Sequence, residues 1–176
     1  AVSRLYSSFG FSYSPFDFLT LRSSIGTGYR VPYGFSEDLH LCSGSPRVWK
    51  GSDLEPEKSV SFNVSADYNI TNFIFGISLY RTNLKNKIGF VEASDFAKSI
   101  GYTYEWKNID DAYVQGIEFS SKALIIKHLI LNANFTINDG KYNHIREDWI
   151  NTDYEDVSKY ISRFPIYTGG LSLTFS

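Results

Sequence analysis

Apolar and polar residues alternate strictly along residues 60–68, where every even-numbered position is apolar or aromatic and every odd-numbered one is small, polar or charged. A period of two places the two kinds of side chain on opposite faces of a β-strand. Residues 129–138 repeat the pattern, with apolar side chains at the odd-numbered positions. We therefore predict a chain built from strands whose two faces meet different surroundings.

The same reading, extended along the chain, predicts about seven strands, at residues 3–13, 18–29, 60–68, 73–90, 102–121, 129–138 and 167–175. A polar kink at residues 108–111 interrupts the fifth. The expected connections are short at 14–17, 69–72 and 122–128, and long at 30–57, 91–101 and 139–159. Short turns on one side and long loops on the other are typical of an outer-membrane β-barrel. A soluble sandwich would show little such asymmetry.

Composition supports a barrel and excludes other classes. Aromatic residues make up 17% of the 176 residues, which suits aromatic girdles at a membrane surface. No apolar run approaches the ~20 residues of a membrane-spanning helix. The net charge of −2 implies no basic face, so nucleic acid is not an expected partner. Because open sheet edges do not occur in lipid, about seven strands predict only part of a larger barrel, over residues 1–176.

Four segments carry a resemblance to a known family, in the family's order. They are Gly28-Tyr29-Arg30-Val31-Pro32, Asp53-Leu54-Glu55-Pro56-Glu57-Lys58-Ser59, Ala112-Tyr113-Val114-Gln115-Gly116-Ile117-Glu118 and Arg163-Phe164-Pro165-Ile166-Tyr167-Thr168-Gly169-Gly170-Leu171. Together they resemble the barrel of a TonB-dependent outer-membrane receptor. The second segment departs from the family pattern, because Gly51-Ser52 stands where Asn-Pro is usual.

The resemblance implies an all-β antiparallel meander within a transmembrane barrel of about 22 strands around a plug. It implies location in the bacterial outer membrane and TonB-driven uptake of a scarce ligand, such as an iron chelate (siderophore), haem or a corrinoid. The plug, through which TonB would act, and the closing strands are expected to lie outside this chain. The loops 30–57, 91–101 and 139–159 would contribute to the ligand mouth.

Several residues near the expected loops are candidates for ligand binding. His40 resembles the iron-ligating histidine of haem receptors in the family, and would bind metal only if haem is the ligand; an ordinary loop histidine is the simpler reading. The other candidates can offer charge or aromatic stacking to an anionic chelate, although a structural role or loop packing with solvated charges is the simpler reading: Tyr29, Arg30, Arg47, Trp49, His144 and Trp149. The acidic third loop, residues 139–159, lacks the spacing of a known calcium loop. The single cysteine, Cys42, permits no internal disulfide.

Two other readings stay open at this point. A passive porin or adhesive barrel would share the strands but lack energised transport. A soluble all-β binding module would instead bury the apolar faces of residues 60–68 and 129–138 in a closed core. The sequence contains no readable nucleophile–base arrangement, so an enzyme is not expected, and no resident cofactor is implied.

Overall fold

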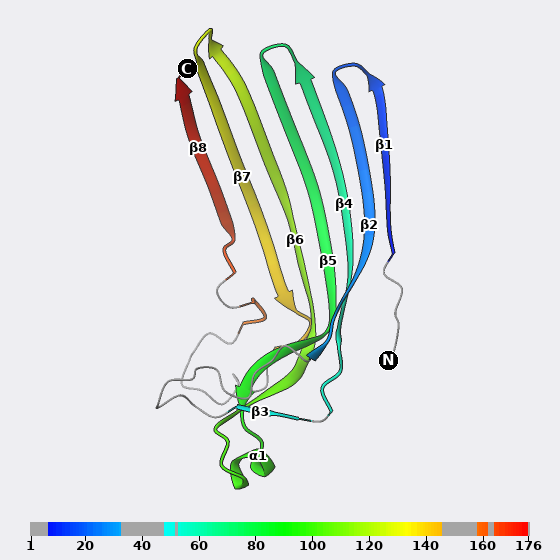
Figure 1. Ribbon diagram of the computed structural model, residues 1–176, viewed down its shortest axis with the longest axis vertical. Coiled ribbons are helices and arrows are strands. Elements are labelled where there is room, and N and C mark those ends of the chain that lie inside the picture. The colour runs from blue at the N-terminus through cyan, green and yellow to red at the C-terminus, as the bar shows by residue number, and fades with distance from the viewer. Residues whose placement is uncertain (1–6, 33–47, 52, 146–157, 162–163, 176) are drawn as a thin grey trace.

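The structure is a computed structural model that describes residues 7–32, 48–51, 53–145, 158–161 and 164–175. One curved antiparallel sheet dominates it (Figure 1). Its strands are β1 (Ser8–Phe16), β2 (Leu19–Arg30), β4 (Glu57–Ile70), β5 (Phe73–Glu92), β6 (Tyr104–Ile126), β7 (Leu129–Tyr142) and β8 (Tyr167–Phe175). They pair in chain order, as a meander. A short strand, β3 (Val48–Lys50), lies beside β6 and runs parallel to it, and the helix α1 (Asp95–Ser99) completes the described elements.

The predicted rhythm of connections is confirmed. Two-residue turns at 17–18, 71–72 and 127–128 join β1 to β2, β4 to β5 and β6 to β7. The other connections are long, and the strand ends that they join point toward the opposite end of the sheet, at the bottom of Figure 1. β5 and β6 reach beyond their neighbours at that end and carry α1 at their tip. We call this end of the molecule the loop end, and the part of β5 and β6 beyond Asn86 the projecting arm.

Three expected boundaries are wrong. Residues 14–16 continue β1, and the turn comes two residues later than predicted. Residues 122–126 were read as part of a turn but belong to β6, because Ala123 pairs with both Phe73 of β5 and Leu131 of β7. Residues 108–111 do not break β6, but they do contain an irregularity. The register shifts between Leu84 and Lys87, where β5 has the extra residue, and again between Lys87 and Ile88, where Ile109 of β6 is the extra residue. The expected start of the first strand at residues 3–6 lies outside the described residues.

The two faces of the sheet differ as the alternation predicts. On β4, Val60, Phe62 and Val64 are exposed, with Val64 retaining 56% of its accessible surface. Exposed apolar side chains of the other strands that lie on the same face, which we call the outer face, include Phe9, Phe11, Ile25, Leu79, Phe135, Ile137 and Leu171. These apolar faces are therefore not packed in a closed core, which removes the soluble-module reading.

The opposite, inner face is polar and hollowed. Ser65, Asp67, Ser78, Glu118, Ser120 and Thr136 are among the residues that line a depression along it. Side chains link neighbouring strands there: Arg22 pairs with Asp67, the Asn63 amide donates to Ser78 Oγ at 2.9 Å, and the Ser61 and Thr82 hydroxyls are 2.9 Å apart. Hydrogen bonding across the inner face thus adds to the main-chain ladder. Among the described residues, no helix is long and apolar enough to cross a membrane.

Burial is concentrated at the loop end rather than beneath the sheet. The described apolar residues with almost no exposed surface are Val48, Ile88, Ala93, Ala97, Ala112 and Tyr142. All of them lie on β3, on α1 and its approach, or on the ends of β5, β6 and β7 nearest the long loops. The loop end is therefore a small packed unit attached to an open sheet.

Candidate functional site at the loop end

The projecting arm is shaped by α1 and β3. Ser94 precedes the helix in extended conformation, Asp95 lies in its first turn and Lys98 in its last, as the helix dipole favours. Gly101 lies two residues beyond the end of the helix, with a φ of 90° that suits glycine, and the Tyr102 N–H donates to the Ala97 carbonyl at 3.0 Å. This turn allows β6 to return beside β5 and brings Ser94 within 2.7 Å of Glu105.

Arg30 and Glu57 join the two strands that enclose the first long loop. The two residues are paired in the ladder between β2 and β4, and the Arg30 guanidinium meets both oxygens of the Glu57 carboxylate, at 2.7 and 3.1 Å. A planar guanidinium suits such a two-point contact. Glu57 Oε1 also accepts the N–H of Ile88, at 2.7 Å. The base of the first loop is therefore tied to β5 as well as to β2.

A β-bulge in β5 is held by side chains from three directions. Asn86 has a positive φ of 55° and interrupts the pairing of β5 with β6. Its N–H donates to Asp111 Oδ1 at 3.0 Å, and its carbonyl accepts from the Asn108 amide at 2.7 Å. Its own amide reaches Glu55 Oε2 at 2.6 Å. The main-chain groups that the bulge removes from the ladder are thus satisfied, and Glu55 couples the bulge to the returning loop.

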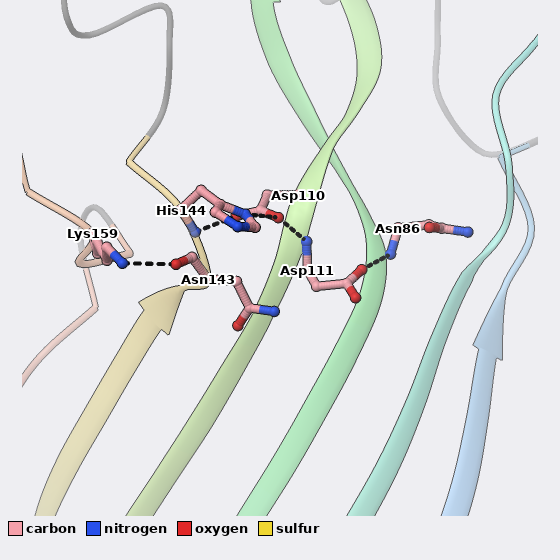
Figure 2. Close-up of polar contacts among 6 residues, drawn as sticks. All are labelled: Asn86, Asp110, Asp111, Asn143, His144 and Lys159. Atoms are coloured by element: carbon pink, nitrogen blue, oxygen red, sulfur yellow. Dashed lines mark hydrogen bonds and ion pairs between the residues drawn. The ribbon is translucent and has the colours of Figure 1, made fainter.

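Asp110 anchors the other side of β6 to the end of the β7 segment (Figure 2). Its carboxylate accepts the main-chain N–H of His144 at 2.7 Å, and the His144 imidazole Nδ1 lies 3.2 Å from it. Burial by itself would raise the pKa of the Asp110 carboxyl, but the hydrogen bonds from His144 and from the Asp111 N–H outweigh it and lower that pKa. Nearby, Lys159 donates to the Asn143 carbonyl at 2.8 Å.

An aromatic hollow of about 590 Å³ lies between β3, α1 and the projecting arm. Trp49 packs edge-on against Phe96 and Tyr102, with ring centres 6.0 and 5.1 Å apart. The residues lining the hollow include these aromatic and polar groups: Trp49, Phe96, Trp106, Lys107, Asn108, Glu55 and Glu105. It combines flat aromatic surface with one cation, Lys107, and three carboxylates, those of Asp53, Glu55 and Glu105. A second hollow adjoins it and is lined by Lys107, Asp110 and His144.

The sequence-predicted site residues divide into three groups. Trp49 and His144 line the two adjoining hollows, and Arg30 lies at the base of the first loop, where it binds Glu57. Tyr29 lies on the outer face, paired with Lys58. The other candidates, His40, Arg47 and Trp149, lie outside the described residues, as do Cys42 and most of the acidic third loop. Among the described residues, no group of three or more potential ligands is placed to hold a metal ion.

Sequence reasoning missed the residues that organise the loop end. Asn86 gives no local signal, because its importance arises from a register shift between two strands. Trp106 and Lys107 were assigned to a strand, and only the parallel pairing with β3 shows that they border a hollow. The polar run 108–111 was the one available signal, and it marks the position opposite the bulge.

Comparison with known proteins identifies the family. The family model described as "TonB dependent receptor-like, beta-barrel" matches residues 2–176. This chain belongs to the TonB-dependent receptor β-barrel family. It is therefore part of a barrel of the bacterial outer membrane, in a family of receptors and transporters rather than enzymes.

Individual relatives have low sequence identity to this chain, and their descriptions agree with the family. The ferrienterobactin receptor of Escherichia coli (strain K12) is 23% identical over an alignment of 133 residues, and the match covers 68% of this chain and 18% of the relative. The siderophore receptor PirA of Pseudomonas aeruginosa superposes with a TM-score of 0.68 and 18% identity, over 78% of this chain and 28% of that one. The siderophore receptor PirA of Acinetobacter baumannii superposes with a TM-score of 0.66 and 20% identity, over 97% of this chain and 26% of that one. The chain thus spans about a quarter or less of the length of these relatives.

Proposed function

We propose that this chain forms part of the ligand mouth of a TonB-dependent receptor that takes up an iron chelate. The observation that carries the proposal is the aromatic hollow at the loop end, bordered by Trp49, Trp106 and Lys107. Aromatic faces suit the planar ligand groups of a chelate, and Lys107 can contact an anionic group of the chelate, although Asp53, Glu55 and Glu105 also line the hollow. Relatives described as ferrienterobactin and siderophore receptors support this ligand class.

The contacts that hold the base of the first loop support a receptor whose binding end is rigid before the ligand arrives. Glu57 and Glu55 fasten the returning end of the first loop to β5, so the loop residues between them and Arg30 start from a rigid frame. Preorganised binding groups cost less ordering entropy when the ligand arrives. Uptake itself would be driven by TonB acting through a plug. A passive porin, by contrast, predicts no saturable binding at this end.

Equilibrium titration of the full-length protein with a ferric siderophore, haem and a corrinoid would test the proposal. Lys107→Gln should weaken binding of an anionic ferric chelate about ten-fold, corresponding to about 1.4 kcal/mol. Lys98→Gln is the matched control, because Lys98 is also an exposed lysine of the arm but pairs with Glu92 at 2.7 Å, away from the hollow. Equal affinities of wild type and Lys107→Gln for every chelate would contradict the proposal.

Haem is the narrower ligand proposal and depends on His40. A neutral imidazole is a competent axial ligand for haem iron. If haem is the cargo, His40→Ala should abolish the change in the haem absorption spectrum on binding. A spectrum that is unchanged by this substitution would remove haem and leave the siderophore and corrinoid alternatives.

A further inference from the structure

We propose that the outer face carries a docking surface for the phosphate headgroup of an anionic lipid. This surface, which we call the cationic belt, consists of Lys58, Arg81, Lys85 and Lys141. All four residues occupy the ladder positions that alternate with the inner face: Lys58 pairs with Lys85, Arg81 with Phe62, and Lys141 with Tyr113. The inference rests on the barrel's place in a membrane and does not depend on which cargo the receptor takes up.

The belt begins where the apolar surface of the outer face ends. The last apolar residue toward the loop end is Val60 on β4, Leu79 on β5 and Ile137 on β7. The next outer-face residues are Lys58, Arg81 and Asp139 respectively. A lipid whose chains cover the apolar band therefore places its headgroup at the belt.

The boundary lies at different levels on neighbouring strands. Phe62 of β4 lies on the same rung as Arg81 and Asp139. The outer face of β4 nevertheless stays apolar until Lys58, four residues farther toward the loop end. The apolar surface therefore ends on one rung on β5 and β7 and extends farther on β4.

The belt carries a local excess of positive charge in a chain whose net charge is −2. Four cations stand against two carboxylates on this part of the outer face, those of Asp139 and Asp111, which gives a local charge of +2. Asp139 pairs with Lys141 at 3.1 Å. Arg81 is bound to the neutral side chains of Asn83 and Gln115 and lies over the Tyr113 ring, 4.6 Å from its centre. Its charge is therefore oriented but not neutralised by these neighbours.

Lys58 and Lys85 give the strongest indication of an anionic partner. They are direct cross-strand partners and both are exposed. Like charges directly opposite each other on one face of a sheet repel. Within the described part of the chain, neither ammonium group has an ion-pair or hydrogen-bond partner. A phosphate group between them would turn this repulsion into two charge-assisted contacts.

Native mass spectrometry of the full-length protein in detergent, titrated with phosphatidic acid or phosphatidylcholine, tests this proposal. The wild type should retain phosphatidic acid preferentially. Lys58→Gln/Lys85→Gln should weaken its retention about five-fold for each cation removed. The matched control is Lys98→Gln/Lys122→Gln, which removes the same charge from α1 and from the inner-face side of β6, and should retain phosphatidic acid like the wild type.

A stability measurement distinguishes lipid binding from a merely structural effect. Without anionic lipid, Lys58→Gln should raise the unfolding temperature, because repulsion is relieved; with phosphatidic acid, it should lower it relative to the wild type. Equal retention of both lipids by the wild type, or equal losses in the belt and control variants, would overturn the proposal. Displacement of phosphatidic acid by the same concentration of inorganic phosphate would assign the belt to a soluble anion and also overturn it.

Discussion

Asp111 and Asn86 are joined across the β5–β6 hairpin by a hydrogen bond in which the Asn86 N–H donates to Asp111 Oδ1 at 3.0 Å. The bond satisfies a main-chain donor that the bulge removes from the ladder. Asp111→Ala should therefore lower the free energy of unfolding by about 1–3 kcal/mol. Asp111→Asn retains an acceptor oxygen and should lose less. Urea unfolding of the full-length barrel in lipid vesicles, followed by tryptophan fluorescence, would measure both, and equal losses would argue against this role.

The positive φ of Asn86 leads to a second prediction, about the stability of variants at this position of the bulge. A β-branched residue is strained at φ 55°, whereas glycine adopts this conformation freely. Both Asn86→Val and Asn86→Gly lose the amide contact with Glu55. The valine variant should therefore be less stable than the glycine variant by about 1–3 kcal/mol. Equal unfolding free energies for the two variants would show that the bulge relaxes without strain.

Glu57 should matter more than its ion-pair partner. Arg30 keeps 56% of its side chain exposed, so its pairing alone contributes about 0.2–1 kcal/mol. Glu57 is only 13% exposed and also accepts the Ile88 N–H. Glu57→Ala should thus cost more stability than Arg30→Ala, by about 1–2 kcal/mol. The single variants and the double variant form a cycle, and a larger loss for Arg30→Ala would contradict this assignment.

Stability at acid pH should depend on Asp110. Contact with His144 and the Asp111 N–H lowers the pKa of this carboxyl in the folded protein below its ordinary value of 3.8. Its contribution is therefore fully present above the ordinary pKa and is lost as the pH falls through the lowered one. Asp110→Asn should lower the free energy of unfolding at neutral pH. It should also reduce the further loss of stability that the wild type shows as the pH falls below about 4. An unchanged acid limb in the unfolding profile would refute the assignment.

Gly116 of β6 lies where the inner face has no room for a side chain. A Cβ at this position would lie 2.4 Å from the Ile137 carbonyl oxygen and 2.6 Å from the Tyr80 hydroxyl. Gly116→Ala should destabilise the barrel by about 1–3 kcal/mol. Gly26→Ala is the matched control, because its nearest atom, Ser8 Cβ, is 3.9 Å away. If both variants unfold at the same denaturant concentration, the close packing at Gly116 does not contribute to stability.

Much of the sheet could be predicted because strand alternation is a local property. In residues 60–68 the polarity of each side chain predicts the face of the strand on which it lies, and the apolar face is exposed on β4. The prediction failed at residues 122–126, where a run of apolar residues has no period of two. Pairing of Ala123 with Leu131 across the following turn, and with Phe73, fifty residues earlier in the chain, makes that segment a strand.

The candidate site was predicted only in part for the same reason. Arg30, Trp49 and His144 could be singled out as residues of suitable chemistry near loops. Their actual neighbours depend on where distant strands meet: β3 adds beside β6, and the shift at Asn86 brings Glu55 and Asp111 to one point. No sequence pattern encodes such a register shift.

By itself, the sequence determined the strands, their two faces and the alternation of short and long connections, because each follows from neighbouring residues and from turn length. Only the tertiary structure decided the bulge at Asn86, the attachment of β3 to the projecting arm, and the meeting of Lys58 with Lys85 across two strands. These features arise from pairing between segments far apart in the chain, where hydrogen bonding and charge act only once the strands are in register.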